Sequence, residues 1–110
     1  MPKPIDDGLI LEVIDRGLSS LGERPKQALW YCLEKDFKFN HSKVPENMEA
    51  FEETLKDFFG LGYRFLECLF RKYLQEATGE DLKNYKTFAE CVNVLRRKNE
   101  NKDYLPKTNP

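Results

Sequence analysis

The chain has 110 residues, which is close to the usual size of one domain and too short for two ordinary ones. Its content of 40% hydrophobic, 13% aromatic and 34% charged residues is typical of a packed globular domain with a solvated surface, and excludes a disordered chain. The formal net charge of -1 provides no strong field to attract nucleic acid or anionic lipid, although residues 1–70 are net acidic and residues 71–110 net basic.

The chain contains no signal for a membrane or for secretion. No apolar run approaches the roughly 18 residues that a spanning helix needs. Asp6 and Asp7 lie where a signal peptide would have its apolar segment. Three cysteines, an odd number without close pairing, are typical of a reducing compartment. We therefore expect a cytoplasmic protein that makes no membrane contact.

Helical periodicity dominates the first half of the chain. The first helix is predicted over residues 5–21, and Gly22 is expected to supply the left-handed residue that ends it. The second helix is predicted over residues 25–37, because proline suits a first helical turn. Residues 39–45 are expected to form a connecting loop with room for one short turn, from which Val44 folds back over Phe51 of the next helix.

The second half of the chain continues the helical pattern. Asn47 is the expected N-cap of a third helix, and a fourth, more apolar helix is predicted over residues 63–77. The spacing from Thr87 to Glu90 is typical of a capping box for a fifth helix, and an earlier start near Asn84 is the alternative. The prediction is an all-α compact bundle of about five helices, with one domain over residues 1–98 and a flexible tail over residues 99–110.

Part of the chain resembles a known family. The similar stretches are Ala28-Leu29-Trp30-Tyr31-Cys32-Leu33-Glu34-Lys35, Val44-Pro45-Glu46-Asn47-Met48-Glu49-Ala50-Phe51, Phe59-Gly60 and Phe65-Leu66-Glu67. They resemble a family of small helical "output" domains from archaea, found alone or attached to signalling proteins, over roughly residues 8–76. The resemblance implies a helical fold and a role in signalling or partner binding, and it supplies no catalytic residues.

Few residues carry the pattern of an active site or a metal site. His41 is the only histidine, and the adjacent Ser42 does not make a triad, so a surface position is expected. The set Cys32, Cys68, Cys91 and His41 would formally make a zinc site, but none of its spacings matches one. We predict no catalytic residue, no metal and no cofactor.

Cys68 differs from the other two cysteines. It lies on the polar side of the fourth predicted helix, with Arg64, Arg71 and Lys72 three or four residues away. Cationic neighbours favour the thiolate, which is the reactive form. One hypothesis is a reactive or redox-sensing thiol. The preferred alternative is a half-buried cysteine that another helix covers.

Charged clusters give two further hypotheses. Arg96, Arg97 and Lys98 are candidate nucleic-acid contacts, but basic residues at a helix end also complement the helix dipole. The third predicted helix carries an acidic set that is most simply a solvated face, although it could dock a basic partner. This set is Glu46, Glu49, Glu52, Glu53 and Asp57.

The apolar face of the fourth helix is wide, covering about half of its circumference. Either the helix is central and buried on both flanks, which is preferred, or part of it pairs with another chain. The candidate interface residues are Trp30, Tyr31, Tyr63, Phe70 and Leu74. The leading functional prediction is a non-catalytic interaction or signalling module with a protein partner or as a homodimer. The alternatives are a nucleic-acid-associated regulator and a thiol sensor.

Overall fold

The computed structural model describes residues 5–104, with side chains described for residues 5–98. Every regular element in this part is helical, so the predicted all-α class is confirmed. In chain order the elements are α1 (Asp7–Ser19), α2 (Glu23–Phe37), the 3₁₀ helix η1 (His41–Asn47), α3 (Met48–Phe59), the 3₁₀ helix η2 (Gly60–Gly62), α4 (Tyr63–Thr78) and α5 (Phe88–Tyr104).

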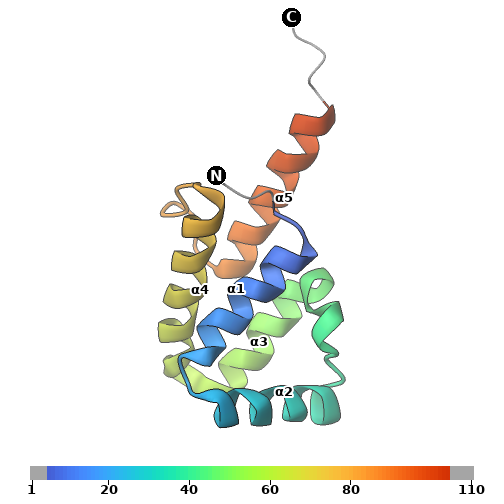
Figure 1. Ribbon diagram of the computed structural model, residues 1–110, viewed down its shortest axis with the longest axis vertical. Coiled ribbons are helices and arrows are strands. Elements are labelled where there is room, and N and C mark those ends of the chain that lie inside the picture. Colours follow the sequence, from blue (N-terminus) through green and yellow to red (C-terminus); the bar gives the residue numbers. More distant parts are fainter. Residues whose placement is uncertain (1–4, 105–110) are drawn as a thin grey trace, which may run out of the picture.

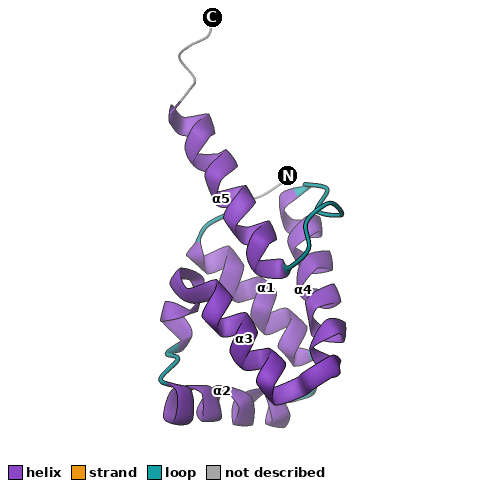
Figure 2. Ribbon diagram, turned by 180° about the vertical axis from the view of Figure 1, so that it is seen from behind, coloured by secondary structure: helices purple, strands orange, loops and turns teal. Residues whose placement is uncertain are grey.

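The long helices pack in a compact arrangement. Helices α1, α3 and α4 lie side by side, and α2 crosses one end of them (Figure 1). The first part of α5 packs against α3 and α4, and the rest runs out at the end opposite α2 (Figure 2). No helix in the described part of the chain is both long enough and apolar enough to cross a membrane.

Helix α4 packs against α1, α3 and α5 on one side, as the preferred interpretation of its wide apolar face predicts in part, while its opposite side is exposed. Its Leu66, Phe70 and Leu74 are almost completely buried. Helix α1 packs closely on it, because Gly17 presents no side chain to the Phe70 ring. The remaining core comes from α1, α2, η1, α3, α5 and the segment before α5, and it includes Ile10, Ile14, Leu18, Leu33, Val44, Phe51, Leu55, Leu82, Phe88 and Val92.

The ends of α1 and α2 differ from the prediction in detail. The side chain of Asp6 is the N-cap of α1, where it accepts a 2.8 Å hydrogen bond from the Leu9 amide. Gly22 does not end α1, which closes at Ser19. It precedes α2 instead, and its φ of +102° is tolerated because glycine has no β-carbon.

The segment before α3 contains the seven-residue 3₁₀ helix η1, which is longer than the one short turn expected within this loop. Val44 is fully buried from this segment, in the same core as Phe51. Asn47 precedes α3 as predicted, but its amide donates to the Lys43 carbonyl at 2.9 Å and makes no cap. This hydrogen bond to Lys43 stabilises η1 instead.

The predicted capping residue of the last helix is confirmed, because Thr87 Oγ1 accepts from the Glu90 amide at 3.0 Å. Helix α5 begins at Phe88 and continues to Tyr104, six residues beyond the predicted end of the domain at residue 98. Residues 105–110 of the predicted tail lie outside the described residues.

Candidate interaction surface

Large hydrophobic side chains are exposed at the end of the molecule where α2 lies. Phe37 and Phe58 close α2 and α3, and their ring centroids are 5.5 Å apart. Leu61 and Phe65 follow on η2 and α4 and are 86% and 61% exposed, while Tyr31 of α2 is 62% exposed. We call these five residues the exposed apolar surface. Large apolar side chains exposed near one end of a soluble domain are candidates for a binding surface.

The turn between α3 and α4 explains the exposure of Leu61. Gly60 adopts φ of 56° and ψ of -130°, a conformation that residues with a β-carbon rarely take. A β-carbon there would meet no atom within 4 Å, so the requirement for glycine is conformational. The turn thus leaves Leu61 on the outside at the point where α4 starts.

Four of the five predicted interface residues do not belong to this surface. Tyr63, Phe70 and Leu74 are at most 2% exposed, because α4 is covered on both flanks by other helices of the same domain. Trp30 is partly buried, stacks on the Phe51 ring and donates to Asp15 Oδ1 at 3.2 Å. Only Tyr31 is free to contact a partner.

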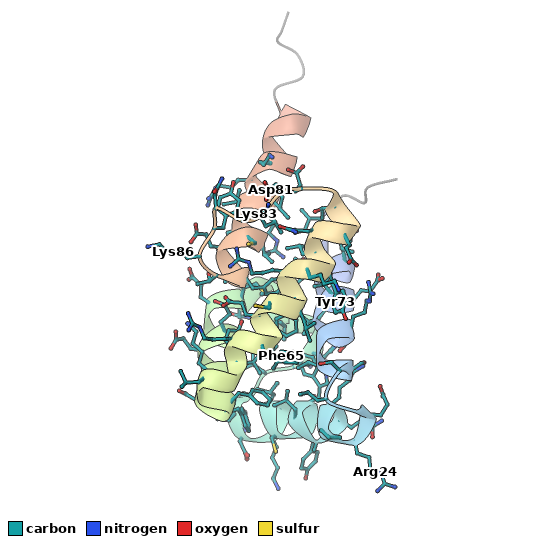
Figure 3. All side chains as sticks on the ribbon, turned by 90° about the vertical axis from the view of Figure 1, so that its left-hand side faces the viewer. Arg24, Phe65, Tyr73, Asp81, Lys83 and Lys86 are labelled. Carbon is teal, nitrogen blue, oxygen red and sulfur yellow. The ribbon has the colours of Figure 1, made fainter. Side chains whose placement is uncertain are left out.

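The outer face of α4 continues the exposed apolar surface toward an open hollow. Phe65 points outward from α4 (Figure 3), and Cys68, one turn later, is exposed. The expectation that another helix covers Cys68 is therefore wrong, because this cysteine is exposed. The hollow is lined by Glu67, Cys68, Arg71, Lys72, Gln75 and Lys83.

One wall of this hollow is held in place by Arg71. Its guanidinium donates to the carbonyls of Leu82, Tyr85 and Lys86 at 2.7, 2.6 and 3.2 Å. Gln75 Oε1 accepts from the Leu82 amide at 2.8 Å. The segment between α4 and α5 is thus fixed by side chains of α4. The guanidinium donors of Arg71 are used in hydrogen bonds within the domain.

A buried carboxylate joins three helices beneath this face. Glu52 of α3 accepts from the Tyr63 hydroxyl at 2.9 Å and from the Ala89 amide at 3.1 Å. Burial raises the pKa of the Glu52 carboxyl above its ordinary value, and burial together with the Glu52 charge raises the pKa of Tyr63. Glu67 Oε2 accepts from the neighbouring Phe88 amide at 2.9 Å. These groups hold the N-terminus of α5, where amide donors are otherwise unpaired.

Glu52 was expected on a solvated acidic face, and that expectation is wrong for this residue, which is 4% exposed. It lies one turn from Met48 and Leu55 and next to Phe51, all of them buried. This position within the apolar stripe was the signal in the sequence. Glu46, Glu49, Glu53 and Asp57 are exposed as expected.

The basic set on α5 is largely used within the domain. Arg96 donates to the Pro45 carbonyl at 2.8 Å and to Asp7 Oδ1 at 2.7 Å. Lys98 pairs with Glu80 at 2.8 Å. Arg97 is exposed and has no such partner within the described residues. The three side chains do not gather into one basic surface.

The remaining candidates lie apart. His41 is at the surface as predicted, with its Nε2 3.1 Å from Asp15 Oδ2 and its ring on the edge of Trp30. Cys32 is half-buried and Cys91 is buried, and burial raises the pKa of the Cys91 thiol. Over the described part of the chain, no three histidine, cysteine or acidic residues converge as a metal site would require.

No protein-family model, curated protein or solved structure matches the chain. The resemblance to archaeal output domains therefore stays a prediction. The geometry of the exposed apolar surface and the α4 hollow provides the basis for a functional proposal.

Proposed function

We propose that the protein is a non-catalytic interaction module that binds a protein partner, or a second copy of itself, through the exposed apolar surface. The single observation that supports this is the exposure of Tyr31, Phe37, Phe58, Leu61 and Phe65 at one end of a domain whose core is otherwise well covered. Aromatic side chains are enriched at the centres of protein interfaces. A signalling role and a cytoplasmic location are parts of the same proposal.

A variant with three surface changes, Phe37→Ser, Phe58→Ser and Phe65→Ser, tests this function. We expect the wild type either to form a concentration-dependent dimer in light scattering or to capture a defined partner in quantitative pull-down. The variant should lose that association by about tenfold or more, since buried aromatic anchors dominate binding energies. Circular dichroism checks that the variant remains folded.

The control carries three serines at exposed charged positions outside this surface: Glu49→Ser, Lys86→Ser and Glu23→Ser. It should associate as the wild type does. Equal solution mass and equal captured proteins for the wild type and the three-phenylalanine variant would refute the proposed function.

A thiol sensor at Cys68 is the second candidate. It is supported by the exposure of this cysteine beside Lys72 and Lys83, which line the same hollow. The test is the response to mild oxidant of the wild type and of Cys68→Ser, read as a change in solution mass or partner binding. An identical response of both proteins would remove this candidate.

The nucleic-acid alternative has less support, because Arg96 and Lys98 are engaged by Pro45, Asp7 and Glu80. It predicts salt-dependent binding of DNA or RNA that weakens when Arg97 becomes Ala. Binding that is absent at low salt would eliminate it.

A further inference from the structure

The outer face of α4 carries an apolar row that no other element covers. Leu61 lies on η2, and Phe65 and Cys68 follow on α4 at spacings of four and three residues, close to the spacing of neighbours on one side of a helix. Leu61 is 86% and Phe65 61% exposed, and Cys68 is exposed. The row runs from the η2 turn along α4 to the hollow. Figure 3 shows the position of Phe65 on α4.

Cations without partners border this row. Arg64 lies beside Phe65, Lys72 lies one turn beyond Cys68, and Lys83 lines the same hollow as Lys72. Within the described part of the chain, no carboxylate lies at ion-pair distance from any of the three.

The acidic groups nearby are mostly engaged. Glu67 is bonded to the Phe88 amide and Asp81 to the Lys83 amide. Glu76, one turn beyond Lys72, is the exposed carboxylate at the far end of the face. A hydrogen bond from an amide leaves a carboxylate charged, so the border carries four cations, with Arg71 included, against these three carboxylates, and keeps one net positive charge.

We propose that this face docks an acidic amphipathic helix of a partner protein, whose apolar row covers Leu61, Phe65 and Cys68 and whose carboxylates pair with Arg64, Lys72 and Lys83. The inference rests on the proposed function and names the partner's chemistry. A helix is the suitable element because its side-chain rows fit along the rows of α4. Complementary charge at the rim fixes register and raises the association rate.

A nucleic acid fits the same face less well. Its phosphates would engage the three cations but would leave the apolar side chains of Leu61 and Cys68 uncovered. The exposed apolar row therefore favours a peptide partner. Binding of a nucleic acid is one of the results that the experiment below distinguishes.

The experiment titrates the full ¹⁵N-labelled chain with a designed helical peptide and follows the amide signals by NMR. The peptide has leucines at i, i+4 and i+7 flanked by glutamates, and a matched peptide has lysines in place of the glutamates. We expect the acidic peptide to shift the amides of residues 61–72 and of Lys83, and to bind about tenfold or more tightly than the lysine peptide.

Variants locate the contact. Phe65→Ser should weaken the acidic peptide about tenfold, and the double change Lys72→Glu and Lys83→Glu should abolish its preference over the lysine peptide. Lys43→Glu, a change of an exposed cation on η1, is the matched charge control and should bind as the wild type does.

Three outcomes would overturn the inference: equal binding of both peptides, shifts confined to other elements, or tight binding only of a single-stranded oligonucleotide added as a third probe. The proposed function would survive any of them if association still depended on Phe37 and Phe58. Loss of that dependence as well would refute both.

Discussion

The Phe70 ring lies against the backbone of Gly17, so that a β-carbon on Gly17 would fall 2.4 Å from two ring carbons. Real β-carbons do not approach other atoms so closely, and the ring is fully buried. The contact between α1 and α4 therefore depends on the absence of a side chain at this one position.

Gly17→Ala should lower the free energy of unfolding by about 1–3 kcal/mol, the usual cost of overpacking a core, despite the better helix propensity of alanine. Urea denaturation measures it. Gly8→Ala on the same helix is the control, because its β-carbon would meet only Asp6 Oδ1 at an ordinary 3.5 Å. A Gly17→Ala protein as stable as the Gly8→Ala protein would contradict the packing argument.

Glu52 makes the stability depend on pH. Burial raises its pKa in the folded state above the ordinary value of 4.5, so the folded chain binds the proton more tightly than the unfolded chain. The contribution of Glu52 should therefore fall as the pH rises from 4.5 through the raised pKa. Glu52→Gln removes this dependence and keeps an oxygen to accept from Tyr63 and Ala89.

The free energies of unfolding of the wild type and of Glu52→Gln should be measured across pH. As the pH rises, the free energy of unfolding of the wild type should decrease relative to that of the variant, so that the two curves converge or cross. Glu53→Gln is the control, since Glu53 is 74% exposed and should leave the profile unchanged. A difference between the wild type and Glu52→Gln that is constant with pH would argue against this account.

Arg71→Lys should loosen the segment between α4 and α5. Lysine keeps the charge but cannot donate to three carbonyls at once, so about 1–3 kcal/mol of local stability should be lost. Hydrogen exchange of the Leu82 and Tyr85 amides should accelerate accordingly. The same change at Arg64, which has no partner in the described part of the chain, should leave exchange unaffected.

The three cysteines should differ in accessibility. Iodoacetamide should modify Cys68 first in the native protein, because it is exposed, while Cys91 is buried and burial raises the pKa of its thiol. Mass spectrometry of peptides follows each site, and denatured protein provides the reference in which all three react. Equal native rates at Cys68 and Cys91 would contradict the burial pattern.

The sequence predicts the helical class well because apolar stripes and Thr87 report on local structure alone. It does not separate a central helix from an interface helix, since Phe70 and Leu74 look the same in both cases. The exposure of Cys68 cannot be predicted from the sequence, because the orientation of α4 relative to its neighbours depends on tertiary packing. Arg96 was assigned to a surface cluster because its partners, Pro45 and Asp7, lie far away in the chain.

Glu52 is the instructive failure. Its charge indicated a solvated face, whereas its place beside Phe51 indicated the core, and the second signal was the correct one. A charged residue inside an apolar stripe needs partners, here Tyr63 and Ala89, and only the tertiary structure reveals them.

The carboxylates that hold the start of α5 belong to α3 and α4, so this helix acquires two of its terminal partners from elsewhere in the chain. An isolated helix of this length is marginally stable in water. The start of α5 should consequently lose stability wherever α3 or α4 is disturbed, because these two helices supply the acceptors for its first amides.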